Sequence, residues 1–89
     1  MNIEDIEKAV EGQPIQKGLC MRIKFKQRDT LCGLFVKHHD YQYLKEKNFW
    51  RIVSETKIAS YKLTKDIHLT KLFNGAEFSK LTNEAMAVK

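Results

Sequence analysis

Two adjacent histidines and an aspartate, His38, His39 and Asp40, are the densest group of chemically active side chains in this 89-residue sequence. Imidazoles and carboxylates bind metal ions and transfer protons. The residues before them predict a strand that continues through the histidines. Neighbouring side chains of a strand point to opposite faces, so we expect the two imidazoles not to share a metal ion. The remaining histidine, His68, stands alone and is expected on the surface of a strand.

Cysteine is the other intrinsically reactive residue type, and the chain has two, Cys20 and Cys32. Neither belongs to a Cys-x-x-Cys pair or has a zinc-type spacing, so we expect two reduced, buried or half-buried thiols, no metal site and no cofactor. No glycine-rich phosphate loop, paired-carboxylate motif or cysteine beside a fixed base is recognisable. We therefore expect no catalytic residues, no small-molecule substrate and no enzymatic activity.

Cationic and aromatic side chains form the third candidate group. The formal net charge is +5, from 16 Lys and Arg against 11 Asp and Glu, and such a field attracts polyanions. A first hypothesis is therefore binding of RNA or single-stranded nucleic acid, with bases stacked on Tyr41 or Tyr43. The phosphates would meet the cations Arg22, Lys24, Lys26 and Lys37. The alternatives are a basic surface that only faces water and tyrosines that pack in a loop or a subunit contact.

The elements that must position these side chains begin with an amphipathic helix, predicted over residues 2–11 from the helical spacing of its apolar residues. Asn2 is its expected N-cap, and Gly12 and Pro14 end it. We expect this helix to lie over an open end of a sheet.

Three strands are predicted next. After a turn at residues 16–18, the segment 19–26 alternates between apolar and mostly cationic side chains, which predicts a strand with one face in the core. A second strand begins near residue 31 and has Gly33 in its interior, where we expect a sharp bend. The third, residues 49–54, has large apolar groups on both faces. It is expected to be covered by the sheet interior on one side and by the helix or another subunit on the other.

Asn74 and Gly75 stand between two apolar-rich runs, which is the pattern of a two-residue β-hairpin turn with both central residues at positive φ. We therefore predict that residues 67–82 form a hairpin from the last two strands. The preceding segment, residues 54–66, fits neither periodicity and is predicted to be a short helix or loop.

Together these segments predict a mainly β fold in one domain, residues 1–89. It consists of the helix, a five-stranded, strongly bent antiparallel small β-barrel over residues 18–82, and a frayed tail over residues 83–89. The composition, 43% hydrophobic and 30% charged, is that of a folded chain. The acidic first helix is neither a signal peptide nor a membrane anchor, and reduced thiols fit the cytoplasm. We therefore expect a cytoplasmic protein without membrane contact.

The pattern resembles the Sm and Sm-like small β-barrels, which have an N-terminal helix and five bent antiparallel strands. The family's second motif, Ile-Arg-Gly-x-x-Ile-x-x-Ile, has the spacing of the segment Phe73-Asn74-Gly75-Ala76-Glu77-Phe78-Ser79-Lys80-Leu81. The first motif, Gly-x-Leu followed by Asp, is echoed by Gly33-Leu34-Phe35 and by Asp40, one residue farther along than usual.

The resemblance implies RNA as a partner and a pocket built from these motifs. The candidate nucleic-acid-binding residues are then Arg22, Lys24, Lys37, His38, Asp40, Tyr41, Tyr43, Asn74 and Gly75. The sequence departs from the family in that Asn74 replaces the Arg of the second motif, and no Asn follows Asp40. The Lys37-His38 pair also lies on an earlier strand than the Lys-His pair of the bacterial Sm-like RNA chaperone.

The resemblance further implies a homo-oligomer, a ring or a smaller assembly, formed by pairing of edge strands. A small sheet with unpaired edges favours such pairing on its own. A second hypothesis follows for the function: a structural or protein-interaction module without a nucleic-acid ligand, in which Phe49 and Trp50 are the contact anchors.

Overall fold

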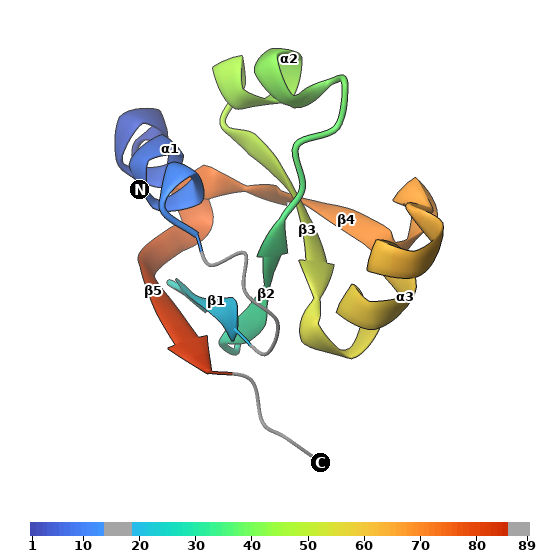
Figure 1. Cartoon of the computed structure of the whole chain (residues 1–89). Helices are drawn as coiled ribbons and strands as arrows, with labels where there is room; N and C mark the ends of the chain where they lie inside the picture. Colours follow the sequence, from blue (N-terminus) through green and yellow to red (C-terminus); the bar gives the residue numbers. More distant parts are fainter. Residues whose placement is uncertain (14–18, 86–89) are drawn as a thin grey trace.

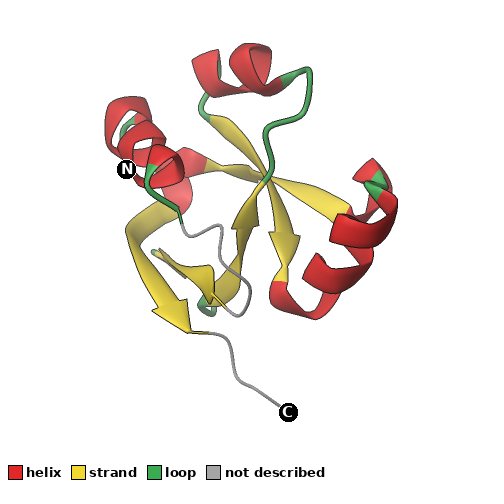
Figure 2. Ribbon diagram, in the orientation of Figure 1, coloured by secondary structure: helices red, strands yellow, loops and turns green. Residues whose placement is uncertain are grey.

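The computed structural model describes residues 1–13 and 19–85. The predicted turn at residues 16–18 and the end of the tail, residues 86–89, lie outside the described residues. The described part has an N-terminal helix, α1 (Ile3–Glu11), followed by a five-stranded antiparallel sheet with two further helices between its strands (Figure 1, Figure 2). None of these helices in the described ranges is long and apolar enough to cross a membrane.

Helix α1 confirms the sequence prediction to within one residue. Asn2 is its N-cap, and the Asn2 side chain accepts a hydrogen bond from the backbone N–H of Asp5 at 2.8 Å. Ile6 and Val10 are buried, so the apolar stripe of the helix faces the sheet. Gly12 caps the other end.

The sheet has the spatial order β4-β3-β2-β1-β5, and every neighbouring pair is antiparallel. The strands are β1 (Leu19–Phe25), β2 (Leu31–Phe35), β3 (Phe49–Ser54), β4 (Thr70–Asn74) and β5 (Phe78–Ala85). The first strand therefore lies between β2 and β5, and β4 and β5 form the two edges. Strand β5 continues to Ala85, beyond the predicted end of the sheet at residue 82.

The predicted hairpin over residues 67–82 is wrong. Strands β4 and β5 follow each other in the sequence but pair with β3 and β1, not with each other. The first residues of the predicted hairpin form a 3-10 turn, η2 (Ile67–Leu69), and a second one, η3 (Gly75–Glu77), joins β4 to β5. Asn74 has a φ of −85°, so the turn with two positive φ angles does not form.

The sheet is strongly curved but not closed into a barrel, because its edges β4 and β5 are not paired with each other. Phe73 of β4 and Phe78 of β5 both pack against Phe25 of β1, with ring centroids 5.6 and 5.4 Å apart. The two edges can contact one side chain only if the sheet bends around it. Gly33, the predicted bend, is a point of close approach, where an added Cβ would lie 2.3 Å from the carbonyl oxygen of Val53.

Two apolar clusters pack on opposite faces of the sheet. The larger one lies under α1 and includes Trp50 and Ile52 of β3. The smaller one includes Val53, the next residue of β3, which packs with Ile58 of helix α3 (Ile58–Thr64). Both faces of β3 are therefore covered as predicted, but α3 covers the second face, instead of α1 or another subunit.

The prediction that Trp50 is a contact anchor is wrong, because its side chain packs inside its own chain. Its side chain is 1% exposed in the larger cluster, whereas the neighbouring Phe49 is 38% exposed. Trp50 therefore stabilises the core of its own chain and cannot reach a partner.

The connections carry the remaining helices. Residues 54–66, predicted as a short helix or loop, contain the 3-10 turn η1 (Glu55–Lys57) and α3. Helix α2 (Tyr41–Glu46) was not predicted. It has only six residues and buries only Leu44, so it shows no apolar periodicity in the sequence.

Candidate functional site

Asp40 immediately precedes α2 and forms an ion pair with Arg51 of β3. Arg51 Nη2 donates a hydrogen bond to Asp40 Oδ2 at 2.6 Å, and Arg51 Nη1 donates one to Thr70 Oγ1 at 3.3 Å. The hydrogen bond from Arg51 lowers the pKa of Asp40 against the opposing effect of burial. The side chains of Asp40 and Arg51 are only 28% and 18% exposed, so the pair holds the start of α2 on the sheet.

The two tyrosines predicted to stack bases have different environments. Tyr41 is half-buried and packs edge to face against Trp50, with ring centroids 6.0 Å apart. Burial raises the pKa of its hydroxyl. Tyr43 is 64% exposed, and the ammonium of Lys47 lies 5.2 Å from its ring centroid. Of the two rings, that of Tyr43 is the more accessible to a ligand.

Two ion pairs join α1 to the segment around Tyr41. Lys37 Nζ lies 2.9 Å from Glu11 Oε2, and Lys45 Nζ lies 2.5 Å from Glu7 Oε2. Both ammonium groups also approach the Tyr41 ring, at 5.6 and 5.7 Å from its centroid. The predicted phosphate ligand Lys37 therefore has a carboxylate partner with which a phosphate would compete.

The histidine pair lies in the loop between β2 and α2. The rings of His38 and His39 are 4.1 Å apart, tilted by 54°. The expectation that they point to opposite faces is wrong, because β2 ends at Phe35 and the strand alternation no longer applies. His68 is exposed as predicted, but it lies in the turn η2, with its Nδ1 3.1 Å from Asp66 Oδ1.

Asn74 and Gly75 build the turn between β4 and β5. The Asn74 side chain accepts a backbone hydrogen bond within the turn at 2.9 Å. Gly75 is buried, and an added Cβ would lie 2.6 Å from Trp50 Nε1. A hollow of about 270 Å³ beside the turn brings Asn74 together with Lys26 and Glu77.

The cations predicted on β1 share their face of the strand with Cys20. Lys24 is exposed and Arg22 is half-buried, whereas Cys20 is fully buried in the smaller cluster. This face is therefore open only toward the Lys24 end of the strand, and the cationic side chains do not form a stripe along all of it.

A groove that the sequence did not reveal lies beside β3 and β4 and has a volume of about 300 Å³. We call it the Arg28 groove. Its cations are Arg28 of the β1–β2 turn, Lys57 of η1 and Lys71 of β4, and no Asp or Glu whose side chain the structure describes lines it. Its other lining residues are Leu31, Ile52, Ser54, Leu69, Leu72 and Phe73.

Arg28 is held at this groove by two aromatic rings. Its guanidinium carbon lies 4.9 Å from the ring centroid of Phe25 and 5.3 Å from that of Phe73. Such cation–π contacts favour a fixed position for an otherwise flexible side chain. The three cations come from three separate segments, so no local sequence pattern could have identified the groove.

A smaller hollow, of about 220 Å³, lies between β2, β3 and α3. Its lining includes the predicted ligand Lys37 together with Lys62, Lys65 and Tyr61, and it holds no carboxylate from the described part of the chain. The structure thus brings Lys37 next to two lysines of the α3 region that the sequence analysis did not single out.

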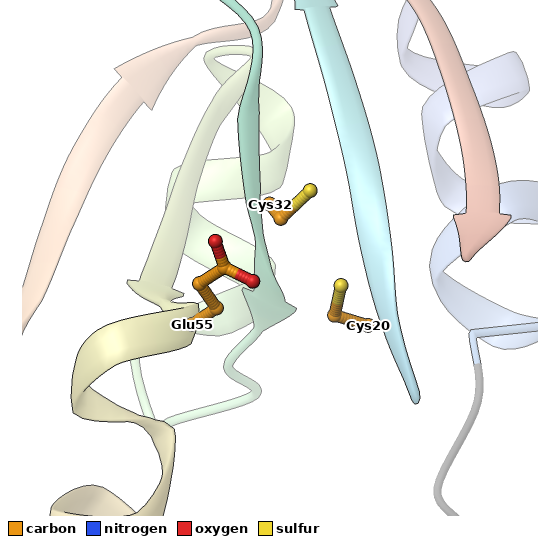
Figure 3. A group of neighbouring side chains, drawn as sticks. All are labelled: Cys20, Cys32 and Glu55. Atoms are coloured by element: carbon orange, nitrogen blue, oxygen red, sulfur yellow. The ribbon is translucent and has the colours of Figure 1, made fainter. Parts of the chain in front are cut away.

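A candidate metal-binding group consists of Cys20 of β1, Cys32 of β2 and Glu55 of η1 (Figure 3). We call it the Cys-Cys-Glu cluster. Their sulfur and carboxylate oxygen atoms lie within 4.8 Å of one another. Cys20 is buried and Cys32 half-buried, as predicted, and Glu55 is exposed. Among the side chains that the structure describes, this is the one place where three or more His, Cys, Asp or Glu converge closely enough to hold a metal ion.

Comparisons with protein families, with characterised proteins and with solved structures give no match to this chain. Its function must therefore be argued from its own residues and from the geometry described above.

Proposed function

We propose that this protein binds RNA or another single-stranded nucleic acid, and that the Arg28 groove is the main contact site. The observation that supports this most is the convergence of Arg28, Lys57 and Lys71 on one groove, which no carboxylate of the described side chains enters. Single-strand binders combine a positive groove that follows the phosphates with apolar or aromatic surfaces for the bases.

The groove offers both kinds of contact. A volume of about 300 Å³ is at the lower end of the range for ligand pockets, roughly 300–1,000 Å³, and suits one nucleotide unit of a longer strand. Phe73 lines the groove and is half-buried, so a base or sugar can rest against it. Arg28 presents a planar guanidinium that can pair with a phosphate or stack on a base.

The residues predicted from the sequence would add contacts outside the Arg28 groove. Tyr43 is exposed on α2 and is available for stacking. Lys37 lines the smaller hollow with Lys62 and Lys65, on the opposite face of β3. Asp40 and Tyr41 contribute instead to the packing of α2, so we assign them an indirect role in the proposed binding.

We also propose that the chain is an Sm-like protein that self-associates through its edge strands, and that the sheet closes toward a barrel. The N-terminal helix and the five curved antiparallel strands support this. So do the outer sides of the edge strands β4 and β5, which pair with no strand among the described residues. Exposed Phe49 and Leu72, near the β4 edge, are apolar surface that a second copy would cover. Such an assembly would serve equally in the alternative function, a protein-interaction module.

The proposal is tested by the fluorescence anisotropy of labelled oligo-U and oligo-A at two salt concentrations. The double substitution Lys57→Gln with Lys71→Gln should weaken binding. It should also reduce the slope of log K against log salt by about 1.4, at about 0.7 for each phosphate contact. The double substitution Lys8→Gln with Lys80→Gln removes the same charge from exposed positions outside the groove.

This control should change the binding less, because its lysines contribute only to the general field. Equal losses in the two double variants would show that net charge alone attracts the nucleic acid. Absence of binding by the unsubstituted protein at low salt would overturn the proposed function.

A further inference from the structure

The Cys-Cys-Glu cluster joins three segments of the chain, β1, β2 and the turn η1. We propose that Cys20, Cys32 and Glu55 bind a Zn²⁺ ion. This site is separate from the Arg28 groove, and the inference does not depend on nucleic-acid binding.

The register of the sheet places the two cysteines diagonally. Cys32 of β2 lies directly opposite Arg22 of β1. Cys20 is two residues before Arg22, so it is a diagonal neighbour of Cys32. The three residues Cys20, Arg22 and Cys32 therefore share one face of the sheet.

This diagonal arrangement favours an ion over a disulfide. Diagonal neighbours in an antiparallel pair are about 7–8 Å apart, whereas a disulfide requires Cα atoms within about 7 Å. A metal ion between the two sulfurs spans a longer distance, because each Zn–S bond is about 2.3 Å long. The strand pairing is thus better suited to two thiolate ligands than to an S–S bond.

The third ligand lies close enough to complete the set. In a tetrahedral site with Zn–S bonds of about 2.3 Å, two sulfur ligands are roughly 3.8 Å apart, and the three donor groups lie within 4.8 Å of one another. Glu55 is exposed, so its side chain has room to bring the carboxylate closer to the two sulfur atoms. Figure 3 shows its carboxylate on the same side as the two sulfur atoms.

The donor set determines the kind of ion. Thiolates are soft ligands and a carboxylate is hard, and Zn²⁺ accepts both, whereas Cu⁺ prefers sulfur and Mg²⁺ prefers oxygen.

On binding, each thiol gives up its proton to the solvent. The two thiolates and the carboxylate leave one net negative charge after Zn²⁺ binds, and Arg22, on the same face, offsets it. Three protein ligands leave the fourth position of a tetrahedral site to water or another ligand.

A bound ion would hold η1 against β1 and β2, next to the smaller apolar cluster. Because Ile58 of α3 belongs to that cluster, the ion would also stabilise the position of α3. Zn²⁺ should therefore raise the melting temperature of the protein.

The test uses the full chain, reduced and treated with a chelator, then titrated with Co²⁺ and Zn²⁺. Co²⁺ should give a thiolate-to-cobalt charge-transfer band, and native mass spectrometry should detect one Zn²⁺ per chain. Cys32→Ser should remove most of the band. Cys32→Ser and Glu55→Gln should each weaken Zn²⁺ binding at least about tenfold, since even changes to groups that only support the ligands cost roughly 10–100-fold.

Glu77→Gln is the matched control, because it removes an exposed carboxylate from the turn η3. It should leave the Co²⁺ spectrum, the Zn²⁺ affinity and the zinc-dependent rise in melting temperature unchanged. Equal effects of Glu55→Gln and Glu77→Gln would overturn the role of Glu55. A Co²⁺ spectrum without a charge-transfer band, or a Cys20–Cys32 disulfide in the purified protein, would overturn the site itself.

Discussion

At the level of single residues, Gly75 occupies a position where only glycine fits. The reason is the lack of space for a side chain, and not the backbone conformation. The backbone N–H of Gly75 donates a hydrogen bond to the carbonyl oxygen of Asn48 at 2.7 Å. Asn48 Oδ1 in turn accepts a hydrogen bond from Trp50 Nε1 at 2.8 Å. A Cβ at position 75 would lie 2.2 Å from that oxygen and 2.6 Å from Ile6 Cδ1. The turn η3, helix α1 and β3 therefore meet at a point without room for a methyl group.

Gly75→Ala is therefore expected to lower the free energy of unfolding by about 1–3 kcal/mol, the usual cost of overpacking a core. Urea denaturation measures the change. Gly12→Ala is the control, because its Cβ would meet only backbone oxygens at 3.6 and 3.9 Å. That variant should be neutral or more stable by up to about 1 kcal/mol. Similar losses in the two variants would contradict the steric explanation.

At the level of elements, the ion pair between Asp40 and Arg51 attaches α2 to the sheet. Asp40 lies at the start of α2, and Arg51 of β3 also contacts Thr70, the first residue of β4. One guanidinium thus links three elements. The short helix α2 buries little apolar surface of its own, so its position depends on such polar contacts.

Asp40→Asn should lower the free energy of unfolding at pH 7 by about 1–3 kcal/mol, the range for hydrogen bonds to charged groups. Because the pKa of Asp40 is lowered in the folded state, this stabilisation is complete above the ordinary carboxyl pKa of about 3.9. It is lost as the pH falls through the lowered pKa.

Urea denaturation from neutral to acidic pH should therefore show the two unfolding free energies converging in acid. The control Asp29→Asn, in the exposed turn between β1 and β2, should follow the unsubstituted protein at every pH. A difference between Asp40→Asn and the unsubstituted protein that stays constant with pH would exclude the charge of Asp40 as its cause.

At the level of the whole molecule, the open edges of the curved sheet are the feature with the largest consequence. We expect light scattering after size-exclusion chromatography to give a multiple of the 10.5 kDa chain mass. Leu72→Lys, on the edge strand β4, should shift the population toward monomer, because it places a charge in apolar surface that the next copy would cover. Leu72 is 50% exposed, so the substitution leaves the core of the chain intact.

Leu63→Lys on α3 is the matched control, since Leu63 is 85% exposed and belongs to a helix instead of an edge strand. It should leave the mass unchanged. A strictly monomeric mass of the unsubstituted protein at high concentration would rule out the proposed assembly.

The sequence by itself determined the elements whose signals are local. The apolar spacing and the Asn2 cap identified α1, and strict alternation identified β1. The break in periodicity at residues 54–66 indicated a short helix or loop, and η1 and α3 lie there. These features depend on neighbours within a few positions, which the sequence displays directly.

Only the tertiary structure decided which segments pair and which side chains meet. The Asn74-Gly75 pattern located a change of direction, but β4 pairs with β3 and β5 with β1, so the two strands lie at opposite edges of the sheet. The Arg28 groove and the Cys-Cys-Glu cluster each draw residues from three separate segments. Because contacts between distant segments depend on the whole packed core, no local pattern contains them.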